Sequence, residues 1–507
     1  MLSKSTFYLN FFSWGFLTGI STNNIILVPF FILGFYKFIH NIQKLNSPLS
    51  GFQLGWLFGF GFFLSSMYWI VNPFLIYEKH LFLAPIVIIL FPILLGIFFG
   101  IAGFFILIFI SINKINESTY LKCFAISISL FFSEYLRSFI FGGLPFNLAA
   151  HIWAYDERFL KIISFVGVYG LSFLTFYWLT FLGLSKIKWS FKSLFSLILF
   201  PIILFSISFL SSDSNLKEPD EVKIRIVQPN ISQKQKWDKT LFQNHIDKLI
   251  RLSTEDMEES HLIVIWPEVA LTVYLNEQKE LIEYIKERIG KNVVLITGGL
   301  RRVFDGSNVK IFNSLFLIHQ DQVVVYDKTR LVPFGEYIPF RSFLKFLKIT
   351  PGDIDFSRGE LQESLEIRYR DNLLKFEPSI CYEAIFQTFN YSNIELFINI
   401  TNDAWFGNLS GPRQHLTASI MRSIEKGVPL VRAANSGVSV ITDKNGKILE
   451  KLNLNNEGFI ETKVASEIGN TPFLIFGKKI LLLEILIIFI ISILLDFFIK
   501  KRKDLKF

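Results

Sequence analysis

Long apolar segments dominate the chain before residue 212, and one more follows near its end. Most of them approach the roughly 20 residues that a helix needs to cross a bilayer. Seven lie in the first part and the eighth is Ile480–Ile499, so the pattern predicts an α-helical transmembrane bundle of eight spans. The first seven are Phe7–Gly19, Ile25–Phe38, Leu54–Val71, Leu83–Ile110, Leu121–Phe139, Leu160–Leu184 and Phe191–Leu210.

A different pattern occupies the stretch between the seventh and eighth apolar segments. Short β-rich runs alternate there with amphipathic helical patterns, which is typical of a layered α/β fold. We therefore expect three parts: a seven-span domain at 1–212, an α/β domain at 213–475, and a last span with a basic tail at 476–507. The predicted elements include helices at Lys239–Leu252, Lys279–Ile289 and Pro412–Lys426, and strand runs at Val222–Gln228, His261–Trp266, Val293–Thr297, Leu373–Ile380 and Leu430–Thr442.

Composition supports a membrane protein and argues against several functional classes. Hydrophobic residues make up 51% of the chain and the mean hydropathy is +0.42. The net charge of +8 is spread among apolar segments, so we expect no nucleic-acid surface. No glycine-rich nucleotide loop follows a strand. The two cysteines, Cys123 and Cys381, lie in different settings and no cluster has zinc-ligand spacing, so we expect neither a disulfide nor a metal.

The positions of lysine and arginine predict the orientation. Basic residues near span ends stay on the cytoplasmic side. The tail at 500–507 is the strongest such cluster, and we expect it to be cytoplasmic, although Lys478 and Lys479 count weakly against this and strict alternation misplaces one early loop. The domain at 213–475 is then outside the cytoplasm, where ATP is not an obvious resource.

Three features of the predicted bundle attract attention. Gly55 with Gly59, and Gly96 with Gly100, form small-xxx-small pairs that let helices approach closely. Glu134 and Arg137 are near enough on one helix to pair, and ionisable groups in a span also leave transport open as an alternative. The segment GGLPFN, residues 142–147, predicts a turn at a membrane surface.

Candidate chemistry lies where three apolar strand runs end. Glu268 follows Pro267 after LIVIW, Lys328 follows VVVYD with Glu336 in the next loop, and Cys381 ends FEPSI. A side chain at a strand end projects into a cleft while the sheet holds it still. Each segment alone also has an ordinary explanation: a helix cap for Glu268, a solvated strand exit for Lys328, and packing for Cys381.

Together the segments resemble the apolipoprotein N-acyltransferases, whose outer domain belongs to the nitrilase superfamily. The matching segments are WPE, YDKTRLVPFGEYIP and ICYE, with transmembrane segments on both sides. The resemblance implies a nitrilase-like αββα sandwich with a Glu268–Lys328–Cys381 triad. It also implies supporting roles for Glu336, Tyr382, Glu383 and Trp237. One departure is Phe146 in GGLPFN, where the family leads us to expect tryptophan.

The expected roles follow from elementary chemistry. A thiol with a pKa of about 8.5 needs a base or a nearby positive charge to become a nucleophile. Glu268 is the expected base and later acid, and Lys328 is suited to stabilise an oxyanion. A Cys/His dyad that uses His415 is the rival scheme.

The resemblance implies the last step of bacterial lipoprotein maturation. Cys381 would take an acyl group from a phospholipid as a thioester and pass it to the N-terminal amine of a diacylglyceryl-cysteine apolipoprotein, by a ping-pong route with no cofactor. We expect a multi-pass monomer in the inner membrane with its catalytic domain on the periplasmic side. The amphipathic segment Phe340–Ile349 would dip into the interface to admit lipid. A tethered amidase, and a transporter or scaffold, are the alternatives.

Overall fold

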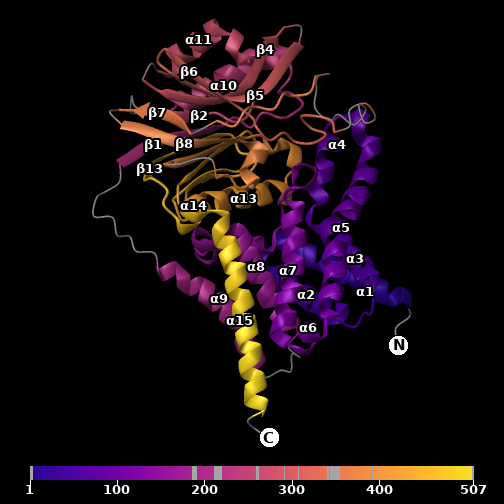
Figure 1. Ribbon diagram of the computed structural model, residues 1–507. Helices are drawn as coiled ribbons and strands as arrows, with labels where there is room; N and C mark the ends of the chain where they lie inside the picture. The colour runs from indigo at the N-terminus through magenta and orange to yellow at the C-terminus, as the bar shows by residue number, and fades with distance from the viewer. Residues whose placement is uncertain are drawn as a thin grey trace. The chain divides into compact units, whose positions relative to one another are not determined.

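A computed structural model gives the fold of the chain (Figure 1). The structure describes residues 4–184, 191–210, 220–257, 262–290, 292–306, 308–339, 342, 354–362, 364–370, 372–389 and 393–504. Two compact units emerge: one comprises 1–71, 82–213 and 475–507, and the other comprises 72–81 and 214–474. Apart from Ser342, the segment Phe340–Ile349 lies outside the described residues.

The first unit is helical. Each of the predicted apolar segments overlaps a helix, and the sharp breaks between helices fall where polar residues, glycine or proline interrupt the apolar runs. The main helices are α1 (Lys4–Ile20), α2 (Val28–Ile42), α3 (Pro48–Ser66), α5 (Ala84–Ile110), α6 (Asn113–Glu117), α7 (Thr119–Arg137), α8 (Ile163–Leu184), α9 (Phe191–Ile207) and α15 (Lys478–Asp504).

The structure does not confirm the prediction of eight spans. Among the described residues, four helical segments are long and apolar enough to cross a membrane: Ile25–Ile42, Glu78–Ile110, Ile163–Leu184 and Lys478–Lys501. A fifth arises if the pair Pro48–Ser66 and Tyr68–Ile76, bent by 67°, is one span. Helices α1 and α9 have only 17 residues each, and α7 carries buried serines together with Glu134 and Arg137.

Glycines bring α3 and α5 into close contact, as their spacing predicts. A Cβ added at Gly55 would lie 2.2 Å from the carbonyl oxygen of Phe99, and one at Gly59 would lie 2.9 Å from the Cα of Gly96. Only hydrogen fits at these positions, so the two backbones approach more closely than any other side chain permits.

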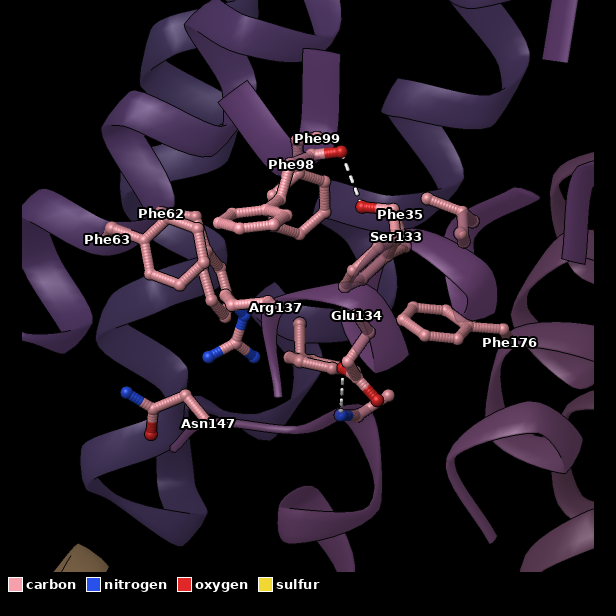
Figure 2. A pocket seen from close by; sticks show the side chains of 13 residues that line it. Phe35, Phe62, Phe63, Phe98, Phe99, Ser133, Glu134, Arg137, Asn147 and Phe176 are labelled. Atoms are coloured by element: carbon pink, nitrogen blue, oxygen red, sulfur yellow. Dashed lines mark hydrogen bonds between the residues drawn. The ribbon is translucent and has the colours of Figure 1, made fainter. Parts of the chain in front are cut away.

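Glu134 and Arg137 bind the turn that follows their helix and form no ion pair with each other in the part of the chain that the structure describes. The Ala149 N–H donates to Glu134 Oε2 at 2.8 Å, and Arg137 Nη1 donates to the Phe146 carbonyl at 2.8 Å and to that of Leu144. Figure 2 shows both charged side chains in a pocket lined by phenylalanine rings. Their observed partners therefore favour a structural role in holding the GGLPFN turn.

Three residues of the GGLPFN segment have the positive φ values that are common in turns. Gly142 and Gly143 have φ values of 90° and 83°, and Asn147 has a φ of 51°. Phe146, which replaces the expected tryptophan, is buried and packs edge-on against Trp69 with ring centroids 5.3 Å apart.

The second unit contains two β-sheets. The seven-stranded sheet has the order β13-β1-β2-β4-β5-β6, with β3 also paired to β4, and the six-stranded sheet has the order β12-β11-β10-β9-β8-β7. The first sheet consists of β1 (Asp220–Gln228), β2 (Ile263–Ile265), β3 (Leu271–Tyr274), β4 (Val294–Asp305), β5 (Asn308–His319), β6 (Gln322–Asp327) and β13 (Gly458–Ser466). The second consists of β7 (Leu365–Tyr369), β8 (Asn372–Ile380), β9 (Leu396–Thr401), β10 (Leu430–Ala434), β11 (Ser439–Thr442) and β12 (Ile448–Leu452).

Three apolar clusters stack this unit into four layers. The central cluster joins the inner faces of the two sheets through residues such as Ile226 and Ile398. A second cluster packs α10 (Phe242–Thr254) and α11 (Lys279–Ile289) on the first sheet, and a third packs α13 (Ser410–Lys426) on the second. The helices lie on the outer faces (Figure 1). The unit is thus an αββα sandwich.

Residues 72–81 belong to this second unit although they lie between helices of the first in sequence. Asn72, at the start of α4 (Asn72–Ile76), donates from Nδ2 to the Phe406 carbonyl at 2.9 Å. The side chain of Asn72 also lies where a Cβ at Gly407 would have to be.

Candidate active site

Strand direction places the three predicted catalytic residues at strand ends. β2 and β4 are parallel, and β4, β5 and β6 are successively antiparallel, so β2 and β6 run in the same direction. Glu268 follows β2 and Lys328 follows β6, which puts both at the same edge of the first sheet. Cys381 follows β8 of the second sheet.

Lys328 lies between two carboxylates. Its Nζ is 2.9 Å from Glu336 Oε1 and 3.2 Å from Glu268 Oε1, and the Lys328 side chain is only 1% exposed. Asn313, on β5, donates from the same Nδ2 to Glu268 Oε1 at 2.8 Å and to Glu336 Oε1 at 2.9 Å. The two acidic side chains are therefore held together by one ammonium group and one amide.

Backbone groups fix the other oxygen of each carboxylate. The N–H of Asn402 donates to Glu268 Oε2 at 2.9 Å, and the N–H of Val332 donates to Glu336 Oε2 at 2.9 Å. Because both oxygens of Glu268 are engaged, its side chain has a fixed direction before any substrate arrives.

The charges set the protonation states of this network. Burial favours the neutral forms, but Lys328, with help from Asn313 and Lys236, holds the pKa of Glu268 below its usual value. Burial also acts to lower the pKa of Lys328, and the Glu268 and Glu336 carboxylates overcome it, so that this pKa lies well above the usual range. The resting site thus holds a carboxylate base and an ammonium group.

Cys381 is held as a thiol in a strained backbone. Burial, and then the negative charge of Glu268, raise the pKa of the Cys381 thiol, against the opposing effect of Lys328. Its φ of 51° lies in the left-handed region, which a residue with a Cβ rarely adopts. Strain of this kind persists where the surrounding structure holds it, often at functional sites.

Glu383 ties the Cys381 turn to the loop after Lys328. Its Oε2 accepts from the Ile380 N–H at 2.8 Å, while its Oε1 accepts from the Thr329 N–H at 2.6 Å. The hydroxyls of Thr329 and Tyr326 and the Arg330 N–H also donate to Oε1. One buried carboxylate therefore connects the ends of β8 and β6, which belong to different sheets.

Tyr382 and Trp237, the other two predicted residues, contribute rings. Tyr382 is buried and packs edge-on against Phe386, with ring centroids 5.0 Å apart. Trp237 is half-buried, and its indole nitrogen has no hydrogen-bond partner within the described ranges. Tyr382 is therefore buried next to Cys381 in the chain. Among the described residues, no hydrogen bond or ion pair joins Trp237 to Glu268, Lys328 or Glu336.

Lys236 belongs to the site although the sequence analysis missed it. Its Nζ donates to the backbone carbonyl of Glu268 at 2.9 Å, and the residue is 5% exposed. Burial lowers the pKa of Lys236 to about 8, against the opposing charges of Glu268 and Cys381. Asn313 and Asn402 were missed too; the only signal for Asn313 is a polar residue within the apolar run of β5.

His415 contacts the backbone of Cys381. Its Nε2 is 3.0 Å from the backbone carbonyl oxygen of Cys381, and its Nδ1 is 2.9 Å from Asp403 Oδ1. Because Nε2 faces a carbonyl acceptor, this nitrogen carries a proton and cannot accept one from the thiol. The arrangement argues against the Cys/His dyad.

No group of three or more metal-ligating side chains with suitable geometry occurs among the residues that the structure describes.

Comparisons with known proteins cover nearly the whole chain. Residues 223–473 match the carbon-nitrogen hydrolase family, and residues 14–179 match the apolipoprotein N-acyltransferase N-terminal domain. The apolipoprotein N-acyltransferase of Rickettsia typhi is 35% identical over 95% of this chain and 97% of the relative. That of Rickettsia prowazekii is 34% identical over the same shares, and that of Brucella melitensis is 31% identical over 82% of this chain and 80% of the relative. The chain therefore belongs to the apolipoprotein N-acyltransferase family.

Proposed function

We propose that the protein N-acylates apolipoproteins by a ping-pong reaction in which Cys381 carries the acyl group as a thioester. Its family makes it an acyltransferase of lipoprotein biosynthesis. The finer proposal names a phospholipid as the donor and the N-terminal diacylglyceryl-cysteine of an apolipoprotein as the acceptor. The catalytic domain is residues 213–475, and the catalytic residues are Glu268, Lys328 and Cys381.

In the first half-reaction Glu268 accepts the proton of the Cys381 thiol, and the sulfur attacks the ester carbonyl carbon of the phospholipid. The carbonyl π electrons move to oxygen, and the Lys328 ammonium stabilises the resulting oxyanion. The intermediate collapses by breaking the bond to the glycerol oxygen, which takes the proton from Glu268. The products are lysophospholipid and the thioester.

In the second half-reaction the acceptor's α-amine attacks the thioester carbonyl. Glu268 takes a proton from the attacking nitrogen, the carbon–sulfur bond breaks, and the proton returns to the sulfur. An amide and the free thiol result. The ester of the donor already supplies an activated acyl group, so neither a nucleotide nor a metal is required.

The observation that carries the proposal is the buried network in which Glu268 and Glu336 share Lys328. An ionised base with both oxygens fixed suits abstraction of the thiol proton, and a lysine held protonated by two carboxylates suits an oxyanion. Glu336 thus acts by orienting Lys328, and Glu383 by holding the turn of the nucleophile.

The apolar helices and the basic tail support the location that we propose. We propose a multi-pass protein of the inner membrane, working as a monomer, with the tail in the cytoplasm and the catalytic domain on the periplasmic side. The phospholipid and the membrane-anchored acceptor are both present at that face.

A donor-only reaction tests the proposal. Purified protein mixed with phospholipid and no acceptor should release about one equivalent of lysophospholipid and then stop, because the acyl group stays on Cys381. Cys381→Ala should release none. Continued release of fatty acid, or release of ammonia from small amides without phospholipid, would instead favour a hydrolase.

A further inference from the structure

His415 forms a hydrogen bond with the backbone of Cys381, the proposed nucleophile. The residue is fully buried on α13, and its Nε2–H donates to the Cys381 carbonyl at 3.0 Å. Helix α13 packs against η12 (Cys381–Ile385), the turn that begins with the nucleophile. The contact therefore reaches the backbone of the nucleophile from a different element.

A buried ion pair holds the other side of the His415 ring. Arg432 Nη2 is 2.7 Å from Asp403 Oδ2 and 3.1 Å from His415 Nδ1, and Asp403 Oδ1 is 2.9 Å from the same Nδ1. All three side chains are at most 1% exposed. The Phe406 ring packs edge-on against the imidazole at 5.4 Å, so the ring has little freedom to rotate.

The hydrogen bond from His415 to the Cys381 carbonyl also helps to hold the unusual backbone conformation of Cys381. Its left-handed φ of 51° costs energy, so neighbouring groups must hold it. The Ile380 N–H, on one side of Cys381, is bound by Glu383, and the Cys381 carbonyl, on the other side, is bound by His415. Since the peptide group is planar, fixing this carbonyl also fixes the direction of the Tyr382 N–H.

We propose that His415, held by Asp403 and Arg432, is a positioning residue that keeps the Cys381 peptide in the conformation from which the thiol reacts. The inference rests on the proposed function for its acylation readout. It assigns His415 no proton transfer with the thiol. The required feature is one N–H donor at the position of Nε2.

Amide side chains of two lengths test this assignment. Glutamine places an amide nitrogen as many bonds from Cβ as Nε2, whereas asparagine reaches only as far as Nδ1. His415→Asn should lower the rate of acyl-enzyme formation at saturating phospholipid by about 100-fold, since misplacing a reacting group by about 1 Å costs that much. His415→Gln should recover most of this loss, and the phospholipid concentration at half-maximal rate should stay the same in both.

Met421→Ala is the matched control, since Met421 is fully buried on the same helix. It should lower the thermal midpoint but leave the acylation rate unchanged. Two results would overturn the proposal by showing that α13 matters only for stability. One is an equal loss of acylation rate in the asparagine and glutamine variants. The other is a loss of acylation rate in Met421→Ala that matches the fall in its thermal midpoint.

Alkylation of Cys381 by iodoacetamide separates this inference from the proposed function, because it needs no phospholipid. We expect slower alkylation in His415→Asn than in wild type, with recovery in His415→Gln, even if wild type forms no acyl-enzyme. Equal alkylation rates in all three proteins would refute the positioning role by itself. If the His415→Asn variant fails to fold, His415→Gln can still be compared with wild type. A loss of about 100-fold in the acylation rate of His415→Gln would then also refute the positioning role.

Discussion

Lys236 and Lys328 both contact Glu268, but they bind different atoms of it. Lys328 pairs with the carboxylate, whereas Lys236 donates to the backbone carbonyl. Both positive charges lower the pKa of Glu268 in the folded protein. Lys236 therefore helps to keep the proposed base ionised without occupying the carboxylate oxygens.

Removal of the Lys236 charge should shift the acid limb of the pH–rate profile. Lys236 carries its positive charge below about pH 8. Glu268 titrates at lower pH, so this charge is present and favours the carboxylate form of Glu268. In Lys236→Met the pKa of Glu268 rises, so the rate of acyl-enzyme formation should fall at a pH about 1 unit higher than in wild type. Stopped reactions analysed from about pH 3 to pH 7, a range that extends to both sides of the usual glutamate pKa of about 4.3, measure the shift.

Two variants control this measurement. Lys236→Arg keeps the positive charge and should leave the acid limb near its wild-type position. Lys234→Met removes the same charge from an exposed residue nearby and should have no effect. An unmoved limb in Lys236→Met, or an equal shift in Lys234→Met, would show that Lys236 does not tune Glu268.

At this scale the sequence permits prediction of residues with distinctive neighbours. Glu268, Lys328 and Cys381 each end an apolar run, and the structure finds them at strand ends. Lys236 and Asn402 have no such signal. The Lys236 side chain contacts the backbone of a residue more than 30 positions away, and the Asn402 backbone contacts a side chain more than 130 positions away. Such contacts arise only from the tertiary fold.

At the scale of elements, the spacing of glycines in α3 and α5 correctly predicts that these two helices pack closely. The lengths of the apolar segments are a less direct guide to the number of membrane spans. Gly55 faces the backbone of α5 with no room for a side chain. The predicted strand Leu430–Thr442 is instead two strands, β10 and β11, because Asn435, Ser436 and Gly437 form the turn between them. The helix predicted at Lys279–Ile289 has those bounds in the structure.

Gly55→Val should separate α3 from α5. The added side chain would meet the Phe99 carbonyl, so the two helices must move apart, at a cost of about 1–3 kcal/mol or more. We expect a lower midpoint of thermal unfolding in detergent. Leu49→Ala, a change at a side chain that is 63% exposed on the same helix, should leave the midpoint nearly unchanged. Equal midpoints for wild type and Gly55→Val would contradict the packing.

At the scale of the whole molecule, the chain forms a helical unit and an αββα sandwich. The number of spans is the least predictable feature from sequence, because short helices and helices with buried polar residues give an ambiguous apolar signal. Both native cysteines are buried, which makes the chain suitable for labelling at introduced cysteines.

The proposed orientation predicts opposite labelling of two such positions. Lys234→Cys, at an exposed site of the proposed catalytic domain, should react with a membrane-impermeant maleimide in intact spheroplasts. Lys500→Cys, near the end of α15, should react only after the membrane is permeabilised. The reverse pattern would place the catalytic domain in the cytoplasm and contradict the proposed location.

Mass spectrometry of the Cys381 peptide tests the central claim most directly. After incubation of the wild-type protein with phospholipid and no acceptor, the peptide should carry one added fatty-acyl mass that hydroxylamine removes, as expected of a thioester. A diacylglyceryl-cysteine peptide should also remove it and appear as the N-acylated product. A Cys381 peptide of unmodified mass, in a preparation that nevertheless acylates the acceptor, would contradict the thioester account.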